Sequence, residues 1–346
     1  MSVAMPVRHL EATAEQQSVS VELESVDCLQ CGGQDQETVI VARDPLTGIG
    51  GSFRVVRCRC CELAFTNPRP TERSIGLFYP ESYVCYAERR PPRKSALQRR
   101  FLRAILRTRY GYPPQATGWT DTVVAAVGRA FIRGTRRRAS WVPFRMPGRL
   151  LEFGCGAGGY MRQMRDHGWI VEGVDASRFM ADRLRSEGLR VHVGTLPHPD
   201  LRPESFDAVT MRHSLEHVHS PRAVLRAAWE VLRRGGLLVV IVPNFASWSF
   251  RHFQHDWQPL ELPRHLTHFA PQTLSAMARA ERFRILAVKQ FSKSKTLRKS
   301  AENATQSGCR SWWLRSLRWG AFNHPAAIWT ERSRQADCLL MIAEKA

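Results

Sequence analysis

The sequence predicts an α/β protein in which a doubly wound, mostly parallel sheet follows a small cysteine-rich ribbon. Three observations lead to this fold class. Short apolar segments alternate with amphipathic ones from residue 149 onward, four cysteines stand in two Cys-x-x-Cys pairs before residue 62, and a glycine-rich turn follows the first apolar segment. With 43% apolar residues in a length of 346, the chain can bury a sizeable core, and no apolar run approaches the about 18 residues of a membrane span.

Apolar runs and capping residues place the elements of the alternating region. Ser177 and Pro221 stand where helices start, and Gly168 and Gly188 stand where helices end. Helices are expected at 160–167, 177–188, 221–234 and from 271 onward. Strands are expected at 149–153, 170–175, 189–193, 206–211, 237–242, 283–289 and 338–343. Such alternation indicates a sheet covered by helices on both faces.

Four cysteines form the pattern Cys28-x-x-Cys31 and Cys58-x-x-Cys61, with short strands expected at 38–41 and 53–57. Four thiolates complete a tetrahedral zinc shell and leave no position open for catalysis, so we expect a structural zinc ribbon. The alternative is four unrelated buried cysteines, and the role of a fifth thiol, Cys60, is open. The expected domains are a tail at 1–27, the ribbon at 28–66, a basic helical linker or cap at 67–147, and a main domain at 148–346 with a basic, tryptophan-rich insert at 292–335.

The first strand of the main domain is followed by Glu152-Phe-Gly154-Cys-Gly156-Ala-Gly158-Gly159. The glycines fit both the G-x-G-x-x-G dinucleotide pattern and the E-x-G-x-G-x-G arrangement of S-adenosylmethionine sites, and pattern alone does not choose. Both need glycine because the backbone turns sharply and approaches a ligand closely. Asp175, at the end of the second strand, can accept hydrogen bonds from ribose hydroxyls in either case. The alternative is a turn that merely joins a strand to a helix.

Further motifs favour the second arrangement. Beside Glu152 to Gly158 and Asp175, they are Ser205-Phe206-Asp207, Leu215-Glu216-His217-Val218, Leu232-Arg233-Arg234-Gly235-Gly236 and Val242-Pro243-Asn244. In their order and spacing the chain resembles the class I S-adenosylmethionine-dependent methyltransferases, which implies a Rossmann-like sheet of seven strands. The cysteine ribbon, Asn67-Pro68-Arg69-Pro70 and residues 262–269 are similar to those of the bacterial subgroup with an N-terminal four-cysteine zinc module. That subgroup includes sugar C-methyltransferases and enzymes of surface-polysaccharide and natural-product pathways.

The resemblance implies roles for individual residues. The glutamate and glycines of the turn would face the methionine part of S-adenosylmethionine, and Asp175 would face the ribose. Thr195 and Leu196 would lie near the adenine, where many members of the family have an acidic residue instead. The expected cofactor-binding residues are Glu152, Gly154, Gly156, Gly158, Asp175, Thr195, Leu196 and Arg212. The expected substrate-binding residues are Tyr79, Tyr83, His213, Arg264, His265 and His268.

His217, beside Glu216, is the expected general base. An imidazole whose pKa lies near neutrality, oriented by a neighbouring carboxylate, suits the removal of a proton from an acceptor hydroxyl or carbon acid. Adjacent helical residues point apart, however, so Glu216 is also a candidate for binding substrate. The plainer alternative is that His217 only has a structural role at the start of a helix.

Positive charge is concentrated in two segments. The net charge is +20. Residues 86–150 carry +14, residues 289–334 carry +8, and the rest of the chain sums to −2. The first segment has apolar residues at helical spacing and the second has Trp312, Trp313 and Trp319, a composition typical of helices that lie on anionic membranes. The alternative is a lid over the cofactor mouth with solvated arginines. We expect a cytoplasmic protein, with or without peripheral contact at the inner membrane face.

Three functions are compatible with these patterns. The leading expectation is methyl transfer to a small-molecule acceptor, such as a sugar or an intermediate of surface-polysaccharide or natural-product synthesis. An RNA methyltransferase would suit the zinc module and the basic charge, but residues 212–215 lack the Asn/Asp-Pro-Pro-aromatic segment of exocyclic-amine methyltransferases, which argues against a nucleic-acid partner. A non-catalytic S-adenosylmethionine-binding protein is the third, and the intact glycine turn with Asp175 weighs against it.

Overall fold

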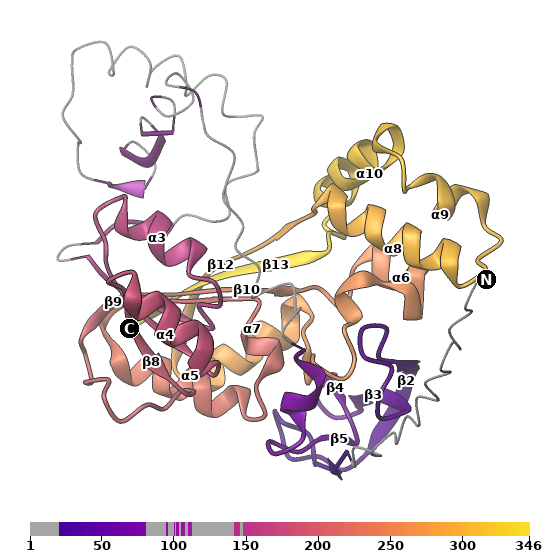
Figure 1. The fold of residues 1–346 in the computed structure, drawn as a ribbon, viewed down its shortest axis with the longest axis horizontal. Coiled ribbons are helices and arrows are strands. Elements are labelled where there is room, and N and C mark those ends of the chain that lie inside the picture. Colours follow the sequence, from indigo (N-terminus) through magenta and orange to yellow (C-terminus); the bar gives the residue numbers. More distant parts are fainter. Residues whose placement is uncertain are drawn as a thin grey trace, which may run out of the picture.

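The computed structural model describes residues 21–80, 95, 100, 102, 103, 105–107, 110–112, 142–145 and 148–346. Tyr83 and most of the basic segment 86–150 lie outside these residues. Figure 1 shows an α/β domain flanked by a small N-terminal unit of strands and by a lobe of helices. Within the described ranges, no helix combines the length and the apolar character needed to span a bilayer.

The central sheet has seven strands in the order β12-β13-β10-β9-β6-β7-β8. β6 (Arg149–Phe153), β7 (Ile170–Asp175), β8 (Arg190–Val193), β9 (Phe206–Arg212) and β10 (Leu232–Pro243) run parallel. β13 (Cys338–Lys345) is antiparallel to both β10 and β12 (Phe283–Phe291). The expected seven-stranded, mostly parallel sheet is confirmed, and each expected strand overlaps an observed one.

Four helices alternate with these strands: α3 (Gly159–Arg165), α4 (Arg178–Ser186), α5 (Pro221–Val231) and α7 (Pro271–Ala280). The Ser177 hydroxyl caps α4 by accepting a hydrogen bond from the backbone N–H of Met180. The expected end of α5 at Arg234 is wrong. The helix ends at Val231 because Leu232 is extended and pairs with Phe206 at the start of β10.

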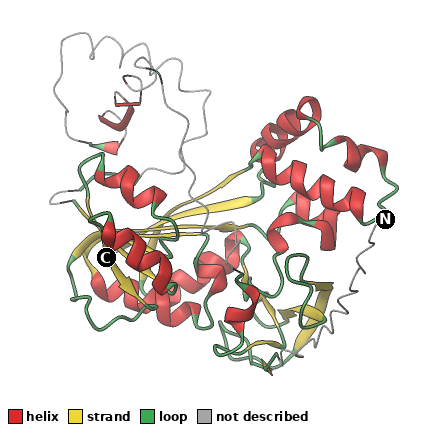
Figure 2. Cartoon of the chain, viewed as in Figure 1, coloured by secondary structure: helices red, strands yellow, loops and turns green. Residues whose placement is uncertain are grey.

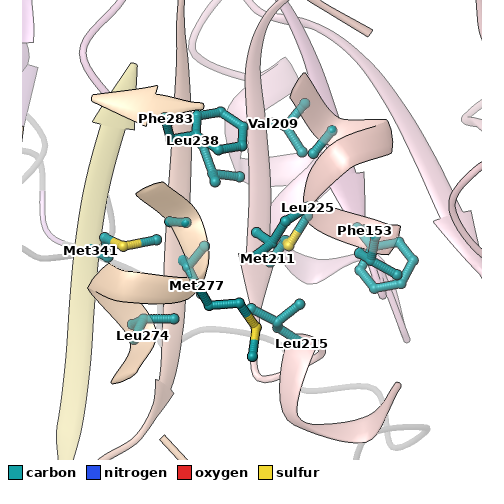
Figure 3. Packing of buried hydrophobic residues seen from close by; sticks show 14 of the residues in the cluster. Phe153, Val209, Met211, Leu215, Leu225, Leu238, Leu274, Met277, Phe283 and Met341 are labelled. Atoms are coloured by element: carbon teal, nitrogen blue, oxygen red, sulfur yellow. The ribbon is translucent and has the colours of Figure 1, made fainter. Parts of the chain in front are cut away.

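Side chains that alternate along the strands fill a core on each face of the sheet. Val209 and Leu238 point to the face covered by α5 and α7, where they pack with Leu225 and Met277 (Figure 3). Neighbouring residues along the same strands point to the opposite face, which α3 and α4 cover. The two cores hold the carboxyl ends of the parallel strands at one edge, where sheets of this kind bind their ligands.

The N-terminal unit is also built around a sheet. Its strands are β1 (Leu23–Glu24), β2 (Gln36–Arg43), β3 (Ser52–Cys58), β4 (Ala64–Thr66) and β5 (Arg69–Pro70), followed by a 3-10 helix at Ile75–Phe78. β2, β3 and β4 are antiparallel, and β1 pairs with β5. β11 (Thr267–His268), which follows β10 in the main domain, pairs with β4 as a fourth strand. The two parts of the chain therefore share one sheet.

The segment between β12 and β13 forms most of a helical lobe (Figure 2). It contains α8 (Ser294–Gln306), α9 (Trp312–Ser316) and α10 (Gly320–Arg332), beside α6 (Trp248–Phe253) from the loop after β10. These helices share a third core with that loop and with the N-terminal unit. The helices contribute Leu297, the loop contributes Trp257, and the N-terminal unit contributes Phe53. The lobe is thus packed against both neighbours rather than being a loose extension.

A buried ion pair joins the N-terminal unit to the loop before β11. The Arg264 guanidinium lies 2.9 and 3.0 Å from the two carboxylate oxygens of Asp44, and it also donates to the carbonyl oxygen of Phe78. The two side chains are only 2% and 0% exposed. Burial alone would raise the pKa of Asp44, but hydrogen bonds from Arg264 and Thr47 outweigh it and lower that pKa. Each charge is therefore satisfied only while the unit and the loop stay together.

We expect Asp44→Asn to lower the free energy of unfolding by about 3 to 5 kcal/mol, because it leaves the charge of Arg264 buried without its partner. Denaturant unfolding of the full chain measures this change. Glu37→Gln is the matched control, since Glu37 lies in the same sheet but pairs with Arg57 at the surface, where the side chains are 42% and 43% exposed. Its effect should stay below about 0.5 kcal/mol. Equal losses in the two variants would contradict the role of the buried pair.

Candidate active site

The glycine-rich turn lies between β6 and α3, at the carboxyl edge of the sheet. Gly154 has a left-handed backbone (φ 72°), and a Cβ there would lie 2.4 Å from the Cβ of Ser214. Gly158 is also left-handed, and its Cβ would lie 2.4 Å from a methyl carbon of Leu184. The chain can follow this path only with glycine at these two positions. The turn therefore presents bare backbone next to β6, as a closely bound ligand requires.

Two acidic side chains border this turn. Glu152 is buried, its Oε2 has no hydrogen-bond partner in the described part of the chain, and burial raises its pKa to about 8 against the opposing charge of Arg212. Asp175 accepts hydrogen bonds from the backbone N–H groups of Gly156 at 2.7 Å and Ser177 at 2.9 Å. Burial raises the pKa of Asp175, and these two bonds offset part of that rise. Asp175 shapes the turn, whereas Glu152 keeps one buried oxygen without a hydrogen-bond partner among the described residues.

The turn after β8 and the end of β9 lie on either side of these carboxylates. Gly194 donates its backbone N–H to the carbonyl oxygen of Asp175. Thr195 is exposed, whereas the Leu196 side chain is buried in the core shared with α5 and α7. Arg212 lies over the ring of Tyr160, with the guanidinium carbon 4.0 Å from the ring centre. Thr195 is thus open to a ligand, and Leu196 can offer only its backbone.

His217 lies in the 3-10 helix Leu215–His217 that follows β9. Its Nδ1 is 3.0 Å from the carbonyl oxygen of Arg264 and 2.9 Å from the hydroxyl of Tyr79. A carbonyl oxygen can only accept, so the proton of the ring belongs on Nδ1, and Nε2 keeps its lone pair. Burial lowers the pKa of His217, which favours the neutral ring. This is the tautomer that a base acting through Nε2 needs.

Glu216 makes its short contact with His213 rather than with His217. Its Oε1 is 3.3 Å from Nδ1 of His213, and Nε2 of His213 is 3.2 Å from the ammonium of Lys293, the residue before α8. An ammonium can only donate, so the His213 proton belongs on Nδ1, toward Glu216. Burial raises the pKa of Glu216 to about 7. Burial, together with the positive charges of Lys293 and Arg212, lowers the pKa of His213 to about 3. We expected the Glu216 carboxylate to orient His217, but the Arg264 carbonyl does so.

Two other expected substrate residues, His265 and His268, lie at the junction with the N-terminal unit. The His265 ring packs edge-on against His217, with 4.6 Å between ring centres. Nε2 of His268 is 3.2 Å from the hydroxyl of Thr66, which also donates to the carbonyl oxygen of His265. His265 therefore adjoins the candidate base, whereas His268 faces the N-terminal unit.

Arg264 is a further residue that was expected to bind substrate. Its guanidinium is committed to the buried pair with Asp44, and its backbone carbonyl faces His217. Tyr79 reaches His217 from the N-terminal unit. Tyr83 lies outside the described residues.

The four cysteines of the two Cys-x-x-Cys pairs come together in the N-terminal unit. All four sulfur atoms lie within 4.8 Å of one another, with Cys28 to Cys61 at 3.4 Å and Cys31 to Cys58 at 3.6 Å. Thiolates at about 2.3 Å from a tetrahedral zinc ion lie about 3.8 Å apart. A Cβ on Gly33 would lie 3.3 Å from the Cys31 sulfur, so glycine gives the cluster its room. The donor set and its spacing fit zinc.

Two further groups of metal-ligating residues occur in the part of the chain that the structure describes. Glu216, His217 and His265 form one, and His192, His198 and Asp200 form the other. In the first group, His217 already contacts the Arg264 carbonyl and the Tyr79 hydroxyl. In the second group, His192 contacts Glu172 and His198 contacts the Val193 carbonyl. We therefore assign no ion to either group.

Residues 125–288 match a family model described as a methyltransferase domain. The match includes the glycine-rich turn, Asp175, and the Glu216-His217 pair. By this match, residues 125–288 are a methyltransferase domain. The N-terminal unit and the segment with α8 to α10 lie outside the match.

The methyltransferase domain is similar to curated relatives. Over 155 residues it is 28% identical to the ubiquinone biosynthesis O-methyltransferase of Idiomarina loihiensis, covering 40% of this chain and 63% of that protein. Over 146 residues it is 32% identical to the 27-O-demethylrifamycin SV methyltransferase of Amycolatopsis mediterranei, covering 38% and 53%. The chain thus spans less than two thirds of either relative. A solved structure from Thermotoga maritima, described as a possible histamine N-methyltransferase, is 20% identical with a TM-score of 0.41, covering 57% of this chain and 83% of that one.

Sequence reasoning missed three residues that support the methyltransferase site from outside the matched region. Lys293 contacts His213, Thr66 contacts His265 and His268, and Asp44 pairs with Arg264. No motif marks them. The one available signal concerned Lys293, which follows the strand expected at 283–289. Strands that run parallel end at the same edge of a sheet, so a residue after this strand could lie near the site.

Gly154→Ala is expected to lower the free energy of unfolding by about 2 kcal/mol or more, because it adds left-handed strain and overlap with Ser214. Gly159→Ala is the matched control, since Gly159 is the first residue of α3 and a Cβ there meets no atom within 4 Å. That variant should be neutral, or more stable by up to about 1 kcal/mol. Denaturant unfolding compares the two, and similar losses would count against the close approach at Gly154.

Proposed function

We propose that this chain transfers a methyl group from S-adenosylmethionine to a small-molecule acceptor, and that the acceptor is a sugar or a related intermediate of cell-surface polysaccharide or natural-product synthesis. One observation carries the proposal. Within the described residues the buried Oε2 of Glu152, near the end of β6, has no hydrogen-bond partner, and the neutral ring of His217 follows β9, which is the neighbouring strand. A cation site close to a base suits an in-line displacement at a sulfonium centre.

The residues around the glycine turn fit S-adenosylmethionine. When bound, it supplies an electrophilic methyl group on a positively charged sulfur. Glu152 would accept from the ammonium of the methionine part, and Arg212 would donate to its carboxylate. Asp175 already accepts two backbone hydrogen bonds, but each carboxylate oxygen has a second lone pair for a ribose hydroxyl. Thr195 and the backbone of Leu196 would border the adenine.

His217 is the proposed base, acting through Nε2. The Arg264 carbonyl holds the proton on Nδ1 and would stabilise the imidazolium once Nε2 has taken a proton from the acceptor. Burial lowers the pKa of His217, so the ring is available in its neutral form near pH 7. Tyr79, at 2.9 Å from the same nitrogen, limits rotation of the ring.

The groups around His217 support an acceptor rich in hydroxyl groups. Glu216, His213 and Lys293 form a row of carboxylate, imidazole and ammonium, and His265 packs beside the base. Such groups can donate to and accept from several hydroxyls of a sugar ring at once. The relatives named above are O-methyltransferases for ubiquinone and rifamycin, and we carry over only the small-molecule class from their names.

We also propose that the cysteine cluster holds one structural zinc ion. The four thiolates would fill its coordination shell, so zinc would hold the N-terminal unit together and take no part in the chemical step. We keep the division into a tail at 1–27, a ribbon at 28–66, a linker or cap at 67–147 and a methyltransferase domain at 148–346 as part of this proposal. Reduced thiolates suit a reducing compartment, so a cytoplasmic location belongs to it as well.

The function is tested with the full chain and labelled S-adenosylmethionine on nucleotide-linked sugars, a quinol and RNA. Label should appear in a sugar, and His217→Ala should lower its turnover by about 10² to 10⁴ with cofactor affinity nearly unchanged. His255→Ala, an exposed histidine outside the site, is the control and should keep full turnover. Label only in RNA, or no label in any acceptor despite cofactor binding, would reject the proposal.

Cofactor binding should release a proton from Glu152. Its pKa of about 8 keeps the side chain mostly protonated at pH 7, and a bound ammonium favours the ionised form, so apparent affinity should rise with pH up to about 8. Calorimetry at pH 7 in buffers of different ionisation enthalpy should show the release of up to about one proton, and Glu152→Gln should abolish it. The same release from both proteins would remove Glu152 from the site.

Elemental analysis of the purified chain should find about one equivalent of zinc. Cys28→Ser combined with Cys58→Ser should remove it, because each substitution deletes a ligand from one pair. Cys60→Ser is the matched control, since Cys60 neighbours Cys58 but lies outside the cluster of four. Retention of zinc by the double variant, or its loss from the control, would contradict the assigned ligands.

A further inference from the structure

The helical lobe carries an apolar patch on its surface. Six aromatic or aliphatic side chains are exposed between residues 312 and 329, which is nearly half of the exposed large hydrophobic side chains in the described residues. Trp313 and Trp329 both adjoin Trp248 of α6, with ring centres 5.8 and 6.0 Å away, so α6, α9 and α10 contribute to one patch. We call these six residues the aromatic surface: Trp312, Trp313, Trp319, Phe322, Ile328 and Trp329.

α10 exposes large apolar side chains on its outer side. Its inner side buries Asn323, Ala327 and Thr330. Its outer side exposes Phe322, Ile328 and Trp329, each more than half accessible to solvent at 54%, 53% and 51%. A helix at the surface of a protein normally has a polar outer face. The described part of the chain thus leaves three large apolar side chains of α10 open to solvent.

The charge around the aromatic surface is positive. Residues 308–334 contain five arginines and one glutamate, and the arginines are all exposed: Arg310, Arg315, Arg318, Arg332 and Arg334. Within the described ranges no ion pair involves these five arginines, and the guanidinium of Arg318 lies over the ring of Trp319. The local charge is thus not neutralised by neighbouring carboxylates.

The charge and the side-chain types of the aromatic surface favour one kind of binding partner. A second copy of the chain, seated face to face on the same patch, would bring like charges together. A layer of anionic lipid would complement the arginines instead. Indole rings also prefer the headgroup region of a bilayer, where the ring is half buried and the N–H remains hydrated.

We propose that the aromatic surface docks on an anionic membrane. The tryptophans enter the headgroup layer, and the arginines contact lipid phosphates. The exposure of the six side chains is inconsistent with a lid in which they pack over the active site. This inference does not depend on methyl transfer.

Docking on a membrane has a consequence for the neighbouring site. Lys293, directly before α8, contacts His213 at the active site, and the Ser292 hydroxyl lies 2.8 Å from that of Thr330 in α10. The lobe is therefore joined to the acceptor side of the methyltransferase domain.

The test is co-sedimentation of the full chain with phosphatidylcholine vesicles that contain roughly one third phosphatidylglycerol. At an ionic strength of about 0.01 M the protein should pellet with these vesicles, and at about 1 M it should not. Trp312→Ser combined with Trp319→Ser should lower the bound fraction about tenfold. Arg315→Gln combined with Arg318→Gln should weaken binding to anionic vesicles and leave the weak binding to pure phosphatidylcholine unchanged.

Phe179→Ser is the matched control, because Phe179 is 72% exposed but lies on α4, outside the lobe. It should bind vesicles as the parent chain does. The proposal is overturned if the parent chain fails to pellet at low ionic strength, or if the tryptophan variant binds as well as the parent. It is also overturned if sedimentation velocity without vesicles shows a dimer, or an electrophoretic shift shows an RNA complex, that the same tryptophan substitutions abolish.

Discussion

The candidate active site depends on the buried contact between Arg264 and Asp44, which lie 220 positions apart in the chain. Two charges taken out of water are tolerated there because the guanidinium meets both carboxylate oxygens and a backbone carbonyl at once. The contact holds the backbone of Arg264, and the carbonyl of that residue sets the tautomer of His217. The N-terminal unit thus takes part in positioning the candidate base.

Burial has the largest effect on protonation at the site. It raises the pKa values of Glu152 and Glu216 and lowers those of His213 and His217, so all four groups shift toward their uncharged forms. A cluster of neutral acids and bases costs less to bury than a cluster of fixed charges. It also responds strongly to a charged ligand, because a single new cation beside a carboxylate can change its ionisation state.

Local sequence patterns predicted much of the fold and part of the site. The strands and most helix starts follow from apolar periodicity and capping residues, and the cysteine cluster follows from the spacing of its two pairs. Lys293 and Asp44 were not predictable, because their contacts depend on how distant segments pack. Arg264 looked available to a substrate because sequence does not reveal burial. The end of α5 was missed because Leu232 suits both a helix and a strand, and pairing with Phe206 decides between them.

The strand β11 pairs with β4 across about two hundred residues, since Thr267 lies opposite Phe65. Until the ribosome has made that late segment, β4 is an edge strand with an unpaired row of backbone groups. Contacts of such long sequence separation form slowly. The N-terminal unit of a nascent chain can therefore pair with other strands for most of translation. Early binding of a metal ion by its cysteines would limit the conformations open to the unit before β11 is synthesised.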